Sequence, residues 1–254
     1  MNKLLSKSVL KQSVKNNWKL WAILTGVLCL FLTIITLVAP RMAEQMANAG
    51  PMRGEFSLMT IYENMVFGMM GITLMLIYAI ATGNKLVASE VDRGTMSFTL
   101  NTPTTRKQII FSKALYYLGS LAAMVVTVGI FGTVASSIVS VDLALGTFWM
   151  MLLGLFLYGL AVSGICFLAS CWFNKSGHSL MIGAGLPVAF FLLNSLSMIE
   201  DLNFFKYFSL NTLFDTGTII KGEGFLIQFI AMAVIGVVLY AVGINKFLRK
   251  DLPL

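Results

Sequence analysis

Six long stretches without a charged side chain dominate this sequence and limit the folds open to it. Each run reaches the roughly 20 residues that an α-helix needs to cross about 30 Å of hydrocarbon. Backbone groups must pair internally there, which leaves closed β-barrels as the alternative. Barrel strands would alternate in polarity, and stretches such as 125–130 and 150–157 do not. The runs therefore predict six spanning helices, over residues 20–40, 64–84, 114–141, 143–174, 176–199 and 224–245.

Composition agrees with this prediction. Hydrophobic residues make up 57% of the chain and charged residues 11%, whereas soluble domains carry about 25% charged residues. We therefore expect an all-α, polytopic membrane protein, with residues 1–254 forming one domain. Within this domain we distinguish an interfacial leader at 1–19, a charged loop at 84–113 between spans two and three, and an outer segment at 200–224 before the last span.

The basic residues predict the orientation of the spans. Fourteen of the eighteen lysines and arginines fall before span one, between spans two and three, between spans four and five, or after span six. The positive-inside rule therefore places both termini in the cytoplasm. The net charge of +7 then reflects topology, not nucleic-acid binding. Acidic residues fall mainly in the predicted outer loops, namely Glu44, Glu55, Asp142, Glu200, Asp201, Asp215 and Glu223.

The leader is not a cleavable signal peptide, because its lysines are spread over nineteen residues and no short apolar core ends in a cleavage site. Two interpretations remain open for it. It is either a solvated basic leader that sets topology or an amphipathic gate helix, since Leu10, Val14 and Trp18 share an arc with the lysines. The lysines recur every four residues, at Lys3, Lys7, Lys11, Lys15 and Lys19.

The residues that could support catalysis or metal binding are few. Cys29, Cys166 and Cys171 lie inside predicted spans and are expected to be packing residues, and His178 lies in a short polar turn. The sequence contains no H-E-x-x-H or G-x-S-x-G motif, and no phosphate loop of the form G-x-x-x-x-G-K-[ST]. We therefore predict no catalytic residue, metal site or cofactor on this chain.

Several residues inside the spans predict local packing. Pro187 should kink span five, with a neighbouring group satisfying the freed carbonyl. Small residues that would allow close helix approach are Gly119, Ala123, Gly154, Gly159, Ser163, Gly164, Gly183 and Gly185. Polar residues that could face a translocation path, or bond their own helix, are Thr127, Thr133, Ser136, Ser137, Asn194 and Ser195.

The loop at 84–113 contains residues that are typical of helix ends and helix starts. A helix over 84–93 would end at Gly94, which can adopt the left-handed C′ conformation. Residues 95–101 would form a link, and Thr102 would cap a basic helix with Pro103 at its first position. On composition alone, the basic residues of this loop could also meet anionic headgroups.

The same loop carries a recognisable series, namely Glu90, Arg93, Gly94, Thr95, Thr102, Pro103, Arg106, Ile109 and Lys113. This series resembles the signature loop of type-2 ABC-transporter permeases, the membrane subunits of bacterial exporters. Residues 207–224 also resemble the segment that precedes the last span in that family. Within it, the chain is most similar to small permeases of peptide exporters from Gram-positive bacteria, such as the phenol-soluble modulin exporters.

The resemblance implies a multi-pass permease in the bacterial plasma membrane. The loop would carry a coupling helix that docks on a separate ABC ATPase, and that partner would hold ATP and Mg²⁺. A second permease half, identical or not, would complete the pathway, and amphipathic peptides or other hydrophobic cargo would move outward. The alternative is a non-transporting scaffold or immunity-type protein that binds a partner through the same loop. The implied coupling residues are Glu90, Asp92, Arg93, Gly94, Thr95, Pro103 and Arg106.

Overall fold

The computed structural model describes residues 5–48, 58–97, 104–139, 143–197, 199–222 and 224–250. These residues form helices and turns without a β-strand, and six helical segments are long and apolar enough to cross a membrane. The prediction of an all-α polytopic fold is confirmed. Spans one, three, four and six are single helices, namely α1 (Lys7–Asn48), α6 (Arg106–Val139), α7 (Leu145–Trp172) and α11 (Phe225–Arg249).

The remaining two spans are composite. Span two consists of α2 (Leu58–Ile61), the π-helix η1 (Tyr62–Gly71), α3 (Ile72–Leu86) and α4 (Ala88–Asp92). Span five consists of α8 (Ser176–Gly183) and α9 (Gly185–Leu196). Three short elements precede the last span, namely η2 (Glu200–Phe208), η3 (Leu210–Leu213) and α10 (Thr216–Lys221).

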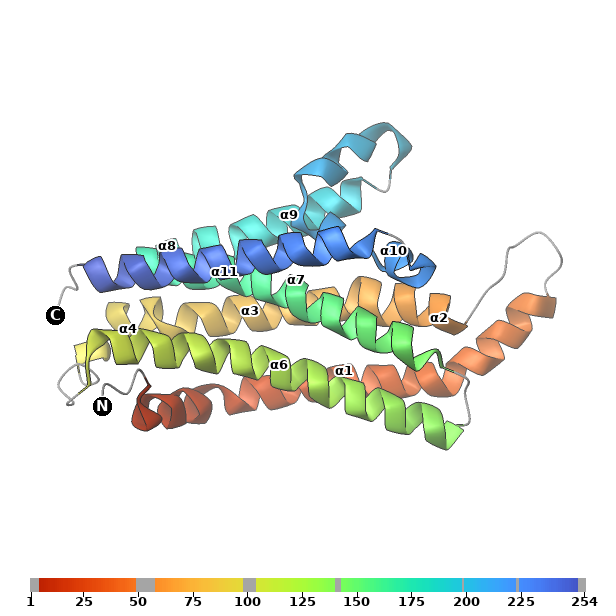
Figure 1. The fold of residues 1–254 in the computed structure, drawn as a ribbon, viewed down its shortest axis with the longest axis horizontal. Helices are drawn as coiled ribbons and strands as arrows, with labels where there is room; N and C mark the ends of the chain where they lie inside the picture. The colour runs from red at the N-terminus through yellow and green to blue at the C-terminus, as the bar shows by residue number, and fades with distance from the viewer. Residues whose placement is uncertain are drawn as a thin grey trace.

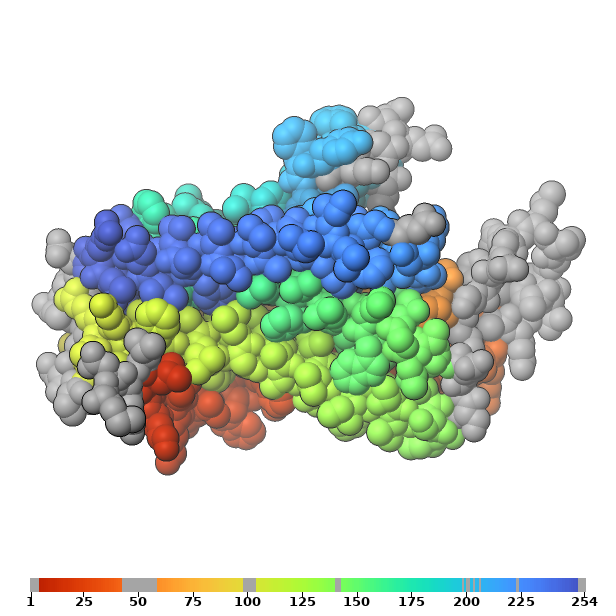
Figure 2. Space-filling model, in the orientation of Figure 1, coloured from red at the N-terminus to blue at the C-terminus, as the bar shows by residue number. Residues whose placement is uncertain are grey.

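Helix α7 is the centre of the bundle. It contacts α3, α6, α8 and α11. Of the residues in its most apolar stretch, 78% are buried, against 17% in that of span five. Figure 2 shows α11 and α6 side by side over α7, which remains visible between them only toward one end. Figure 1 shows that α1 begins, α11 ends and α4 lies at the same end of the bundle, which we call the basic end.

The leader and the first span form one continuous helix. Helix α1 starts at Lys7 and passes Lys19 without a break, so the predicted boundary at residue 19 is not an element boundary. Its described lysines are all exposed. A separate stripe of α1 is buried, and near the basic end it includes the polar Ser13 and Asn17 as well as Val9; Ser6, just before the helix, is also buried.

The π-helix at the start of span two departs from the α-helix that an apolar run predicts. Its wider turn brings backbone carbonyls close to the following glycines. A Cβ added at Gly71 would lie 2.8 Å from the Val66 carbonyl oxygen, and one at Gly68 would lie 3.1 Å from that of Glu63. Glycine at these two positions therefore permits the local geometry.

The predicted effect of Pro187 is confirmed. Span five is divided at Ala184, three residues before the proline. Proline lacks an N–H, so the carbonyl four residues earlier, that of Gly183, loses its partner in the helix. The Cys166 thiol donates to this carbonyl, with Sγ 3.0 Å from the oxygen. Cys166 is therefore a hydrogen-bond donor as well as a packing residue.

Polar side chains within the spans mostly bond to the protein itself, as the membrane interior requires. The Tyr117 hydroxyl donates to the Ala79 carbonyl, and the Tyr240 hydroxyl donates to Ser163 Oγ. Five of the six predicted path residues bond their own helix backbone: Thr127, Thr133, Ser136, Ser137 and Ser195.

The glycines predicted to pack closely divide into two groups. A Cβ would meet neighbouring side chains within 3.2 Å at Gly154, Gly159, Gly164 and Gly183. At Gly119 and Gly185 it would meet nothing within 4 Å, so the packing prediction is wrong for these two.

The sidedness of the bundle is open to a direct test. Lys107 at the start of α6 and Lys221 at the end of α10 are both exposed, and the described cysteines are buried. We expect Lys221→Cys to react with a membrane-impermeant maleimide on intact cells and Lys107→Cys to react only after lysis. The reverse pattern would contradict cytoplasmic termini.

Candidate functional site

The helix of span two breaks at the basic end of the bundle. Val87, between α3 and α4, has φ −129° and ψ −64°, which interrupts the helical hydrogen-bond ladder. Side chains from two other helices satisfy the backbone groups beside the break. The Ala88 N–H donates to Ser170 Oγ of α7 over 2.8 Å, and the Leu86 carbonyl accepts from Lys113 Nζ of α6.

Lys113 also neutralises Glu90, one of the two acidic residues of α4. Its Nζ lies 2.5 Å from Glu90 Oε2, and the side chains are 2% and 20% exposed, respectively. A buried ammonium is strongly unfavourable unless a counter-charge and hydrogen-bond acceptors surround it. The Glu90 carboxylate and the Leu86 carbonyl supply these. We call Lys113, Leu86, Glu90, Ala88 and Ser170 the Lys113 cluster; it connects α3, α4, α6 and α7.

Helix α4 ends where the sequence predicts. Gly94 has φ +70°, the left-handed conformation, and its N–H donates to the Val91 carbonyl over 3.0 Å. The expectation of one unbroken helix over 84–93 is wrong, because Val87 divides it. The segment predicted as a loop at 84–113 is therefore helical at both ends, with α3 and α4 on one side and α6 on the other.

The Asp92 side chain bonds to the start of span five. Its Oδ2 accepts from the Ser176 N–H, the first residue of α8, over 3.1 Å. Asn84 Nδ2 donates to the Ser176 hydroxyl over 2.7 Å. A carboxylate at a helix N-terminus pairs an orphan N–H and favours the positive end of the helix dipole. Asp92 thus links α4 to α8.

The Arg106 side chain bonds to the backbone at the end of span six. Its Nη1 donates to the Lys250 carbonyl over 3.1 Å. Lys250 Nζ in turn donates to the Cys171 carbonyl over 3.1 Å. Desolvation by burial, with Lys246 nearby, lowers the pKa of Lys250 to about 8. Arg106 and Lys250 therefore hold the ends of α6, α7 and α11 together.

The start of α6 corrects a second prediction. Thr104 and Thr105 precede the helix, which begins at Arg106. The Thr105 N–H donates to Gln108 Oε1 over 2.9 Å, and the Gln108 N–H donates to Thr105 Oγ1 over 3.3 Å. This reciprocal capping box satisfies two backbone donors at the helix start. The T-x-x-Q spacing was the missed signal; Thr102 and Pro103 lie outside the described residues.

Arg93 and Thr95 remain exposed beside Gly94. With Glu90 they line a polar pocket of about 410 Å³ whose other wall is the leader part of α1. Asn17 on that wall is 3% exposed, and its Oδ1 has no hydrogen-bond partner in the described part of the chain. This contact between α1 and the loop was not predicted from the sequence. The four-residue spacing of Ser13 and Asn17, which places both polar side chains on one face of a helix, is a sequence signal for it.

The sequence-predicted residues thus serve two roles. Glu90, Asp92 and Arg106 bond to other helices through their side chains, whereas Arg93 and Thr95 are exposed at the basic end, where the Thr95 hydroxyl donates to the nearby Glu90 carbonyl. The sequence profile of the ABC-2 family transporter proteins matches residues 8–252. The chain belongs to this ABC-2 transporter family. A comparison with curated proteins gave no significant match.

Membership fixes the general class of the molecule. An ABC-2 permease is a membrane subunit that works with a separate ABC ATPase, where ATP is hydrolysed, and generally with a second permease half. The family and the six apolar helices make this a multi-pass membrane protein, which in bacteria lies in the plasma membrane. The resemblance to type-2 ABC permeases is confirmed at this level.

Removing one partner of the Lys113–Glu90 pair should have unequal effects. Glu90→Gln leaves a buried ammonium without a counter-charge and should lower the free energy of unfolding by about 3 kcal/mol. Lys113→Met leaves a carboxylate that borders the polar pocket and should cost about 1–2 kcal/mol, mainly for the Leu86 carbonyl. Reversible unfolding in mixed micelles measures both.

The double variant and a matched control complete this test. Glu90→Gln with Lys113→Met should cost less than the sum of the single changes, because the two side chains interact directly. Lys107→Met, at an exposed position of the same helix, should change the free energy by less than about 0.5 kcal/mol. Strictly additive losses would show that the pair is not coupled.

Proposed function

We propose that this permease couples ATP hydrolysis on a partner ATPase to the outward movement of amphipathic peptides or other hydrophobic cargo. The observation that carries the proposal is the Lys113 cluster. It attaches the start of the predicted coupling loop to the central helix α7 and to α6. A displacement of the loop by the ATPase is thereby transmitted to spans two, three and four as one unit.

Exposed residues of the loop are the proposed ATPase contacts. Arg93 and Thr95 follow the end of α4 and are accessible at the basic end. Glu90, Asp92 and Arg106 are proposed to act indirectly, because their side chains hold α6, α8 and α11. In this division of roles, the positioning residues keep the loop rigid and the exposed residues bind.

A second permease half is proposed to complete the pathway. Spans five and six are the least buried of the described spans: 17% and 22% of the residues in their most apolar stretches are buried. Their outward side chains are large and apolar, as at Met181 and Ile227. Such faces suit both lipid and a neighbouring subunit, and the proposal holds for two identical or two different halves.

The apolar character of the groove beside span five supports hydrophobic cargo. A groove of about 330 Å³ between α7, span five and α11 is lined by Ile165, Leu168, Trp172 and other apolar side chains. Sugars or ions would need several converging polar groups, because an unpaired desolvated polar atom costs about 1–3 kcal/mol. Polar side chains of spans three and five mainly bond their own backbones, as Thr127 and Ser195 do.

Arg93 gives the sharpest test of coupling. In a reconstituted complex with the ABC ATPase that co-purifies, Arg93→Ala should lower permease-stimulated ATPase activity about tenfold, as expected when an interface anchor is removed. Lys246→Ala is the matched control. Lys246 is also exposed at the basic end, but it lies over the Trp172 ring and outside the loop, so its loss should have little effect. Equal effects would refute the assigned docking surface.

Transport into vesicles tests the cargo. Amphipathic helical peptides should stimulate the ATPase of the complex and be exported, whereas sugars should do neither. Stimulation and export by sugars alone would contradict the proposed cargo. A complex that binds a cytoplasmic partner without any change in ATPase activity would instead favour the non-transporting scaffold.

A further inference from the structure

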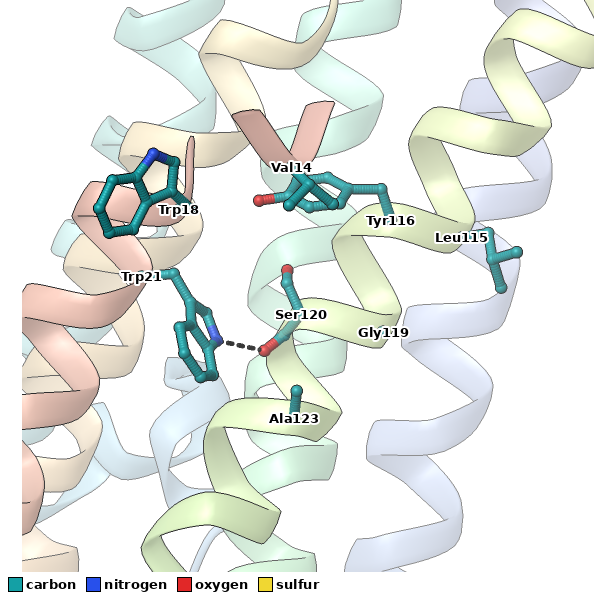
Figure 3. A pocket seen from close by; sticks show the side chains of 8 residues that line it. All are labelled: Val14, Trp18, Trp21, Leu115, Tyr116, Gly119, Ser120 and Ala123. Carbon is teal, nitrogen blue, oxygen red and sulfur yellow. Dashed lines mark hydrogen bonds between the residues drawn. The ribbon is translucent and has the colours of Figure 1, made fainter. Parts of the chain in front are cut away.

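An apolar groove lies between α1 and α6 near the basic end. Its volume is about 320 Å³, and its walls are formed by Val14, Trp18, Trp21, Leu115, Tyr116, Gly119, Ser120 and Ala123. Figure 3 shows the α1 side chains on one side and the backbone of α6 at Gly119 and Ala123 on the other. The groove is lined mainly by carbon atoms, and the polar groups on its walls are those of Trp21, Ser120 and the Tyr116 hydroxyl.

Two hydrogen bonds hold the walls of the groove together. Trp21 Nε1 donates to the Ser120 carbonyl over 2.9 Å, as Figure 3 shows. Closer to the basic end, the Ser6 N–H donates to Ser112 Oγ over 2.8 Å. The groove is therefore a formed feature of the α1–α6 contact, while Val14 and Trp18 remain 50% and 53% exposed.

The groove lies at the boundary of the apolar runs. Trp18 lies two residues before the uncharged run of span one, and Leu115 lies two residues after Lys113, the last charged residue of span three. Tryptophan is enriched at the headgroup level of membranes. Two independent helices thus place the groove where acyl chains meet headgroups.

Basic side chains continue the same face of α1 toward the basic end. Lys7, Lys11, Val14, Trp18 and Trp21 are spaced by four, three, four and three residues, which keeps them on one side of the helix. Lys7 and Lys11 are exposed. With a rise of 1.5 Å per residue, Lys11 lies about 4.5 Å beyond Val14 along the axis.

We propose that this groove binds a glycerophospholipid with an anionic headgroup. The acyl chain lies against Gly119, Ala123 and the two tryptophans, and the phosphate lies at Lys7 and Lys11. Apolar walls alone fit any lipid, and the lysines beyond them select negative charge. This site depends on the membrane location of the chain and is independent of the transported cargo.

Lipid retention by the purified full-length chain tests the headgroup contact. Native mass spectrometry from mixed micelles should show phosphatidylglycerol retained in preference to phosphatidylcholine. Lys7→Gln or Lys11→Gln should each lower that preference about fivefold, the effect of one basic side chain near an anionic surface. Lys19→Gln is the control, because Lys19 lies about 140° around the helix from Val14.

A glycine substitution tests the acyl-chain contact. Gly119→Leu should abolish retention of both lipids, because it fills the groove, whereas Gly26→Leu should not. A Cβ at either glycine meets nothing within 4 Å, so neither backbone position is closely packed against a neighbouring helix. Equal retention of the two lipids by the wild type would overturn the proposal. So would an equal loss in Lys19→Gln, unchanged retention in Gly119→Leu, or capture of an amphipathic peptide instead of lipid.

Discussion

The buried ammonium of Lys113 is the interaction on which the basic end of this permease depends. A charge this deeply buried is stable only with its acceptors in place, and those acceptors are the Leu86 carbonyl and the Glu90 carboxylate at the α3–α4 break. The break leaves the Leu86 carbonyl without a helical partner, and Lys113 donates a hydrogen bond to it, which offsets the cost of an unpaired carbonyl in an apolar environment. Each feature therefore stabilises the other, and α3, α4 and α6 cannot be positioned independently.

The contacts around the cluster extend this dependence to the other spans. Ser170 connects the break to α7, Asp92 connects α4 to α8, and Arg106 connects α6 to the end of α11. The leader part of α1 closes the polar pocket beside Arg93. In an ABC-2 permease, such a continuous set of contacts offers a physical route from the proposed ATPase-docking loop to the bundle.

The sequence predicted the spans and the end of α4 but not the break. Uncharged runs and Gly94 carry strong local signals, since span length and left-handed conformation restrict which residues are allowed. Leu86, Val87 and Ala88 carry no such signal. Their break is stabilised by Lys113 and Ser170, 27 and 82 residues away from their bonding partners, and one sequence does not reveal such pairings. The Thr102-Pro103 pair predicts too early a start for α6, because the reciprocal Thr105–Gln108 capping box sets the start at Arg106.

Hydrogen–deuterium exchange of the full-length permease tests the central claim most directly, because it reports opening of backbone hydrogen bonds segment by segment. If the Lys113 cluster holds the break, Lys113→Met will accelerate exchange across residues 86–97 and at the start of α6 together. Lys107→Met will leave both segments as slow as in the wild type. Unchanged exchange at residues 86–97 in Lys113→Met would contradict the account.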